Sequence, residues 1–145
     1  MRNIILALRF SMSFIMLWAF FDKTLGLGFD TPAGMGWIHG VSPTDGFLRM
    51  AVKGPFAPVF NAMAGSGLVE WLFMMGLLGV GLSFLIGHSM KFAGYCGAAM
   101  MVLMYLSLLL PVFNPVVDEH IIYALVFVLV GVSKEARSWM SLQKA

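Results

Sequence analysis

The chain has 145 residues, of which 60% are hydrophobic and only 11% are charged, and its mean hydropathy is +0.90. A soluble domain uses roughly 25% charged residues to cover its surface, so this composition predicts a protein that lies mostly in lipid. The net charge of +2 and the lack of a basic run argue against a nucleic-acid partner. Cys96 is the one cysteine, which excludes an intramolecular disulfide or a redox-active cysteine pair within the chain.

Four apolar windows reach or nearly reach the roughly 20 residues that a helix needs to cross a bilayer. They cover residues 3–21, 67–87, 92–110 and 115–133. The sequence therefore predicts an all-α fold in one membrane domain, residues 1–145: a polytopic four-helix bundle. The short stretch 87–91 predicts a tight hairpin, and Asn114–Pro115 is typical of a helix start.

Residues 22–66 form a long connection between the first two predicted helices. The connection is too apolar for free solvent, and a structureless loop of this length is improbable in a compact protein. We expect short helices in it, one capped by Thr44 and one opened by Pro55 or Pro58. Because irregular backbone at membrane depth must be covered by protein or line a cavity, we expect an extracytoplasmic lid over a binding site.

Positive charge predicts the orientation of the chain in the cell membrane, because Lys and Arg concentrate in short cytoplasmic segments. With both termini cytoplasmic, and with them the tail 134–145, the inner side carries Arg2, Lys91, Lys134, Arg137 and Lys144. The cations Lys23, Arg49 and Lys53 then lie together in the long outer connection, and the aromatic residues Trp18 and Trp71 at the outer boundary and Trp139 near the inner one fit this placement. Small residues on the second and third helices allow close packing, either within the bundle or in a homo-oligomer: Gly76, Gly79, Gly81, Gly94, Gly97 and Ala98.

Arg9 and Glu70 lie within the first two predicted spans, and each has two interpretations. Arg9 either extends its side chain to cytoplasmic headgroups or faces the bundle interior, where it binds an anion, a quinone oxygen or a carboxylate. Glu70 either stabilises the start of its helix or faces the lid as an interior carboxylate paired with Lys23 or Arg49.

Three polar residues, Asp118, Glu119 and His120, open the fourth predicted helix. Negative charge is favourable at a helix N-terminus, and histidine ionises near neutral pH, so His120 either serves proton transfer or contacts headgroups and loop. The three histidines do not pair on facing helices, so no haem site is predicted. A metal site formed by His39, Asp118 and His120 has no specific spacing, and we expect no bound metal; nucleotide-binding motifs are absent from the sequence.

Four stretches of sequence resemble a known family. They are residues 9–23 (RFSMSFIMLWAFFDK), 37–48 (WIHGVSPTDGFL), 69–79 (VEWLFMMGLLG) and 114–124 (NPVVDEHIIYA). The first resembles the first helix of DoxX-like and DoxD-like membrane proteins, which pairs an early Arg with a Lys at the helix end. The other three resemble the DoxD-type branch, and the similarity spans essentially the whole chain, including the lid.

The resemblance implies a four-helix subunit in the membrane of a bacterium or archaeon. DoxD-type proteins are described as the large subunit of thiosulfate:quinone oxidoreductase, which oxidises thiosulfate to tetrathionate, reduces a membrane quinone and has a smaller partner subunit. The broader DoxX group implies an alternative, a non-catalytic membrane module that anchors a redox or oxidative-stress partner. The apolar lid leaves open a third function, the binding of lipid or another small molecule.

For the enzyme hypothesis, quinone is the expected co-substrate and membrane lipid surrounds the chain. The candidate catalytic residues are Arg9, Glu70, Asp118 and His120. Thiosulfate, a dianion, would be attracted by cations of the lid and its surroundings: Lys23, Arg49, Lys53 and His120. The candidate quinone and substrate contacts are Trp37, His39, Trp71 and Tyr105, with Arg9 or Tyr105 near the quinone carbonyl.

Overall fold

The computed structural model describes residues 1–111, 114 and 116–137, and within them it contains helices and loops but no strand. Three helices are long and apolar enough to cross a membrane: α1 (Arg2–Leu25), α3 (Gly67–Ile86) and α4 (Met90–Ser107). A fourth apolar helix, α5 (Glu119–Val132), is shorter. The all-α prediction is confirmed, and the chain has helices of membrane-spanning length, as its composition predicted.

Shorter elements complete the described part of the chain. They are a 3₁₀ helix at Trp37–His39, a π-helical turn at Phe47–Ala51, α2 (Ala57–Asn61) and α6 (Lys134–Arg137). Proline occupies the first turn of α2, as predicted for Pro58. The cytoplasmic tail predicted for residues 134–145 lies outside the described residues from 138 onward, and this includes Trp139 and Lys144.

The predicted cap at Thr44 is wrong, because another hydroxyl does the capping. Helical backbone begins at Asp45, and Ser42 Oγ accepts hydrogen bonds from the amides of Thr44 (3.4 Å) and Asp45 (3.0 Å). A side-chain oxygen reaches amides two or three residues further along the chain, so Ser42 has the correct spacing. The Thr44 hydroxyl is buried and has no hydrogen-bond partner among the described residues.

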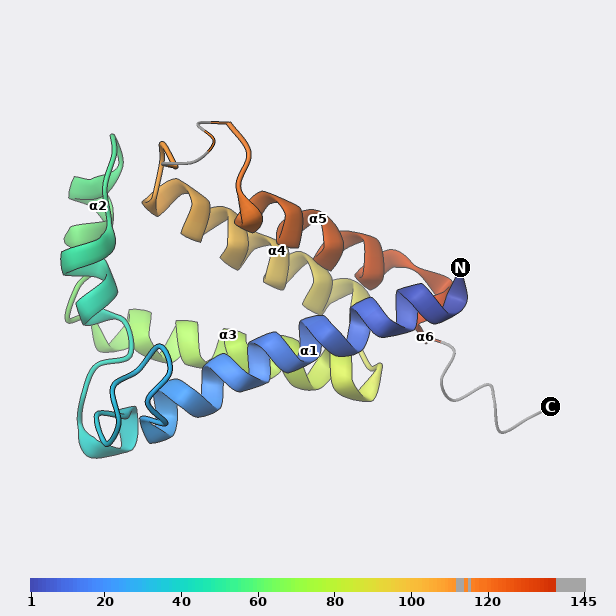
Figure 1. The fold of residues 1–145 in the computed structure, drawn as a ribbon, viewed down its shortest axis with the longest axis horizontal. Coiled ribbons are helices and arrows are strands. Elements are labelled where there is room, and N and C mark those ends of the chain that lie inside the picture. The colour runs from blue at the N-terminus through green and yellow to red at the C-terminus, as the bar shows by residue number, and fades with distance from the viewer. Residues whose placement is uncertain (112–113, 115, 138–145) are drawn as a thin grey trace.

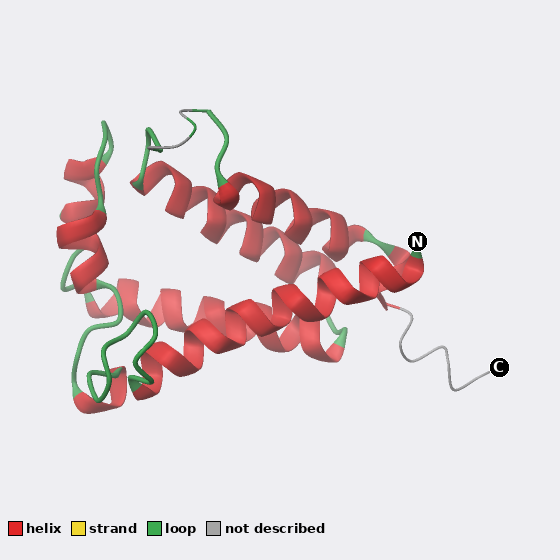
Figure 2. Cartoon of the chain, viewed as in Figure 1, coloured by secondary structure: helices red, strands yellow, loops and turns green. Residues whose placement is uncertain are grey.

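The four longer helices form two pairs that are arranged like a V (Figure 1). Helix α1 packs along α3, and α4 packs along α5. The pairs converge at the end that holds the N-terminus and α6, which we call the closed end, and they diverge towards α2 at the open end (Figure 1). Figure 2 shows that the longer loops gather at the open end.

Glycines bring the helices of each pair into close contact. A Cβ added to Gly94 would lie 2.7 Å from the Phe127 carbonyl oxygen and 2.9 Å from Gly131 Cα, so α4 and α5 touch backbone to backbone. A Cβ on Gly81 would lie 2.7 Å from the Leu17 side chain, which joins α3 to α1. Small residues therefore serve packing within the chain at these positions, which is the internal one of the two predicted roles.

Arg9 joins three helices at the closed end. Its side chain is only 1% exposed, and its guanidinium donates hydrogen bonds to the carbonyl oxygens of Phe84, Leu85 (2.7 Å) and Ala136 (2.8 Å). The last carbonyls of α3 have no partner within their own helix, and a cation is favourable at this end of a helix dipole. Arg9 thus faces the interior, as in one of the two interpretations, but its hydrogen bonds go to backbone carbonyls and its guanidinium also lies over the Phe10 ring, 5.0 Å from the centroid.

A folded loop follows α1 at the open end. The Asp22 carboxylate is buried and accepts hydrogen bonds from the backbone amides of Thr31 (2.8 Å) and Phe29 (3.3 Å), which turn the chain back onto the helix end. Trp37 then packs edge-on against Trp71 of α3, with ring centroids 4.7 Å apart. Asp22 therefore places the beginning of the long connection against the α1–α3 pair.

The connection also reaches the second helix pair. The Lys53 amide donates a hydrogen bond to the carbonyl oxygen of Ser107, the last residue of α4, at 3.0 Å. A Cβ on Gly54 would overlap the Leu109 carbonyl oxygen, so the two backbones are in direct contact there. Residues 22–66 thus contact both helix pairs at the open end, opposite to the Arg9 contacts.

We predict that Arg9→Lys destabilises the protein although the charge is kept. An ammonium cannot reproduce the planar set of three hydrogen bonds, and two lost bonds to a charged group predict a decrease of at least about 3 kcal/mol in the free energy of unfolding. Denaturant titration in detergent micelles measures this value. Arg2→Lys is the matched control, since Arg2 is exposed on the same helix; equal stability of the two variants would contradict a structural role of the Arg9 hydrogen bonds.

Candidate functional site

Asp118 and His120 form a polar pair at the open end, where α5 begins. Asp118 is the N-cap of α5, and its carboxylate accepts hydrogen bonds from the amides of His120 (3.0 Å) and Ile121 (3.3 Å). The second carboxylate oxygen lies 2.8 Å from Nδ1 of the His120 ring. The two side chains are 8% and 14% exposed, respectively, so the contact is largely shielded from solvent.

The helix begins later than the sequence pattern suggested. The predicted start at Asn114–Pro115 includes Pro115, which lies outside the described residues. The Asn114 side-chain oxygen accepts hydrogen bonds from the amides of Val116 (3.0 Å) and Val117 (3.2 Å), which closes a turn. Asp118 is therefore the residue that caps α5, and the turn before it belongs to the connection from α4.

Local contacts stabilise the charged form of Asp118. The carboxylate is surrounded by hydrogen-bond partners, because one oxygen accepts from the amides of His120 and Ile121 and the other contacts the His120 ring. The ionised carboxylate then holds the ring in one orientation through Nδ1, so that Nε2 is the ring nitrogen able to meet a ligand.

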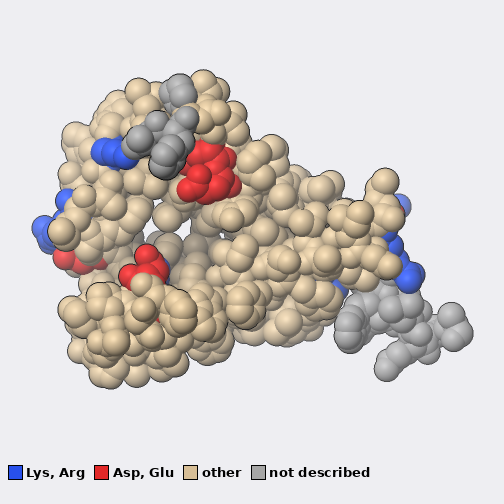
Figure 3. Space-filling model, in the orientation of Figure 1, with Lys and Arg blue, Asp and Glu red and all other residues tan. Residues whose placement is uncertain are grey.

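A cavity of about 440 Å³ borders this pair. Its walls combine apolar and polar side chains, namely Lys53, Leu108, Pro111, Asn114, Val117, Asp118, Glu119, His120 and Ile122. Figure 3 shows acidic side chains at the rim of a hollow on this face of the molecule. Apolar walls with a few converging polar groups are typical of sites for small organic ligands.

Three elements bring the cavity together. Lys53 comes from the connection between α1 and α3, Leu108 follows α4, and His120 belongs to the first turn of α5. Tyr105 supports the wall, because its hydroxyl donates a 2.8 Å hydrogen bond to the Val116 carbonyl oxygen. The sequence analysis singled out Lys53, Tyr105, Asp118 and His120, but it did not find the apolar lining, because those residues follow no helical or strand periodicity.

The charged residues Lys23, Arg49 and Glu70, which the sequence analysis also proposed, do not line this cavity. Lys23 pairs with Asp30, and Arg49 pairs with Asp45 at 2.8 Å, so each of these cations is neutralised within its own segment. Glu70 lies in the first turn of α3, and within the described part of the chain it forms no ion pair with either cation.

The aromatic and histidine side chains predicted to contact quinone or substrate do not lie together in one site. Trp37 and Trp71 pack on each other, and His39 is exposed at the end of its 3₁₀ helix. Arg9 is at the closed end, whereas Tyr105 is near the open end of α4, so these two side chains cannot flank one ligand (Figure 1). The structure therefore divides the predicted residues among several places.

A cation could in principle be held by Asp118, Glu119 and His120, whose possible ligand atoms lie within 4.8 Å of one another. This set differs from the metal site considered in the sequence analysis, because it contains Glu119 and not His39. Helix capping and the His120 contact already account for the geometry of Asp118, so the cluster alone does not indicate a metal centre.

Comparisons of the chain with protein-family models, with curated proteins and with solved structures find no match in any of the three. The resemblance to DoxD-type proteins consequently depends on the four quoted stretches. Any assignment of function has to come from the site itself.

We predict that charge and capping at Asp118 can be separated by two substitutions. Asp118→Ala should lower stability by about 1 kcal/mol through loss of the cap, whereas Asp118→Asn should keep most of the capping energy. Asp118→Asn removes the charge that faces the His120 ring, so the wild type should be more stable than this variant by the contribution of the charged contact.

Thermal unfolding in detergent at pH 7 measures both effects. The wild type should be more stable than Asp118→Asn, which has no carboxylate at this position, and Asp118→Asn should be more stable than Asp118→Ala. Equal stability of the wild type and Asp118→Asn would show that the carboxylate charge contributes nothing to the contact with His120.

Proposed function

We propose that the chain is the membrane subunit of a quinone-linked oxidoreductase and that the cavity at the start of α5 holds the quinone ring. The observation that carries this proposal is the shielded Asp118–His120 pair in the wall of a cavity that is otherwise partly apolar. A quinone ring is flat and apolar and has two carbonyl oxygens that accept hydrogen bonds, so it needs this combination of surfaces.

The polar pair supplies what quinone reduction requires from a protein. Conversion of a quinone to a quinol takes up two electrons and two protons. When the His120 ring is protonated on both nitrogens, Nδ1 donates to Asp118 and Nε2 donates a hydrogen bond to a quinone carbonyl. The Asp118 carboxylate stabilises this ring while it gives and regains a proton. Glu119 is exposed beside the pair and can return protons from water. The electrons would come from a partner subunit.

In the four-span placement that we propose for the chain, the short α5 puts this site inside the membrane. Helix α5 has 14 residues, which extend about 21 Å at 1.5 Å per residue, against a hydrocarbon core of about 30 Å. If α5 is the fourth span and α6 lies near one surface, the Asp118 end falls short of the opposite surface. Polar backbone at that depth must be covered by protein.

Residues 22–66 can provide that cover, which supports their role as a lid. In support of this role, the backbone of Lys53 contacts Ser107, that of Gly54 contacts Leu109, and Lys53 itself lines the cavity. A quinone would then enter sideways from lipid, between the diverging helix pairs, while the lid shields the ring from water.

The charges around the cavity indicate whether the chain itself binds an anionic electron donor. Lys23 and Arg49 are paired locally, and Lys53 faces a wall that also holds Asp118 and Glu119. A dianion such as thiosulfate is not favoured by this balance, whereas a neutral quinone is unaffected. We therefore assign quinone binding to this chain, and the oxidation of thiosulfate, the donor implied by the resemblance, to the partner subunit.

We predict that His120→Leu weakens binding of a short-chain ubiquinone or menaquinone about tenfold, because one hydrogen bond of about 1.4 kcal/mol is lost. The measurement is quenching of intrinsic fluorescence by the quinone in the purified full-length protein in detergent. His39→Leu is the matched control, since His39 is exposed outside the cavity. An equal effect of both substitutions, or no saturable binding to the wild type, would refute the quinone site.

Membranes that contain the chain together with its partner should reduce added quinone on addition of thiosulfate, and His120→Leu should slow this reduction. Reduction of quinone by other electron donors but not by thiosulfate would support the quinone site and exclude thiosulfate as the donor. A chain that binds no quinone but copurifies with a stoichiometric redox partner would instead be the non-catalytic anchoring module.

A further inference from the structure

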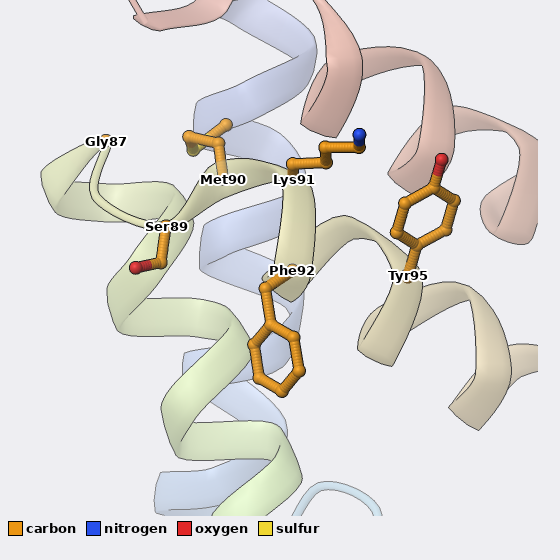
Figure 4. Close-up of a pocket in the computed structure, with 6 residues that line it drawn as sticks. All are labelled: Gly87, Ser89, Met90, Lys91, Phe92 and Tyr95. Carbon is orange, nitrogen blue, oxygen red and sulfur yellow. The ribbon is translucent and has the colours of Figure 1, made fainter.

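A second cavity, of about 520 Å³, lies at the closed end beside the turn between α3 and α4. Its lining residues are Gly87, Ser89, Met90, Lys91, Phe92 and Tyr95 (Figure 4). Both helices at this turn are long enough to cross a membrane, so the cavity lies where the phospholipid headgroups of one surface would be. It is remote from the Asp118–His120 pair, which belongs to the open end.

The polar groups of this cavity are arranged for an anion. Lys91 and Tyr95 are four residues apart on α4 and therefore share one face of the helix. Figure 4 shows the Lys91 ammonium and the Tyr95 hydroxyl pointing to the same side. No Asp or Glu is among the lining residues, and within the described residues Lys91 forms no ion pair. Two donors are thus available and no acceptor charge opposes an anionic ligand.

Arg9 is close to this cavity but does not compete for the ligand. A Cβ added to Gly87 would lie 2.9 Å from an Arg9 terminal nitrogen, so the guanidinium lies directly behind the turn. Its hydrogen bonds go to three backbone carbonyls, and the residue is buried. Arg9 therefore fixes the position of the turn, while Lys91 is the cation that a ligand meets.

An apolar surface continues from the polar groups. Phe92 is 74% exposed and Tyr95 is 50% exposed. In Figure 4 the Phe92 ring points away from the Lys91 ammonium and lies in the angle between α3 and α4. A ligand with a charged head and an apolar chain would satisfy both surfaces, since the chain can follow Phe92 while the head remains at Lys91.

We propose that this cavity binds an anionic phospholipid, with its phosphate at Lys91 and Tyr95 and an acyl chain against Phe92. The proposal uses the membrane placement given under Proposed function but not the quinone site. Anionic headgroups attract each nearby Lys or Arg by an amount that corresponds to about a fivefold change in affinity. Loss of Lys91 should therefore weaken retention of the lipid about fivefold.

The test is lipid retention by the purified full-length protein, measured by native mass spectrometry. Phosphatidylglycerol and phosphatidylcholine with identical acyl chains are the two probes. The wild type should retain phosphatidylglycerol in preference to phosphatidylcholine, and Lys91→Gln should lose about fivefold of this preference. Tyr95→Phe should lose part of it. Lys134→Gln is the matched control, because Lys134 is an exposed lysine at the start of α6 and is not in the cavity.

Three outcomes would overturn the proposal. The wild type could retain both lipids equally, or Lys91→Gln and Lys134→Gln could reduce the preference by the same amount, which would indicate general surface charge. Inorganic phosphate could also displace phosphatidylglycerol at concentrations similar to that of the lipid, which would identify a free-phosphate site. None of these outcomes depends on quinone, so failure of the quinone site leaves this test unchanged.

Discussion

The buried guanidinium of Arg9 is the interaction on which the arrangement of the helices depends. An ionised side chain is costly to bury, by several kcal/mol even after relaxation. Here the cost is offset by hydrogen bonds to three carbonyls, those of Phe84, Leu85 and Ala136. Two of these carbonyls end α3, where the helix dipole favours a cation. Because the guanidinium reaches α3 and α6 from α1, it joins the α1–α3 pair to the short helix that follows α5.

The contacts of Arg9 at the closed end also affect the cavity at the open end. The helix pairs diverge from Arg9 (Figure 1), and the space at their open ends includes the cavity of about 440 Å³ that Lys53 of the long connection lines. Helix α5 begins only at Glu119, so Asp118 caps it at the border of this space and the His120 ring meets the cavity. The position of the polar pair therefore follows from where the pairs diverge and where α5 starts.

The sequence was informative wherever one residue or a regular period decides a local structure. Apolar windows located α1, α3 and α4, and Pro58 marked the start of α2. The sequence could not predict the partners of Arg9, because Phe84 and Ala136 contribute backbone carbonyls that any residue type could supply. It also could not predict the ion pair of Lys23 with Asp30, which depends on how the loop folds back, whereas Arg49 and its partner Asp45 are four residues apart in one helical segment.

Opposite electrostatics at the two ends follow from this folding. Local pairing neutralises Lys23 and Arg49, so the open-end cavity retains Lys53 together with Asp118 and Glu119. The closed-end cavity has Lys91 and no acidic lining residue. An anionic headgroup is thus disfavoured at the open end and attracted at the closed end, whereas a neutral ring is selected by hydrogen bonding rather than by charge. Amphiphiles of the same membrane can therefore occupy the two cavities without competing.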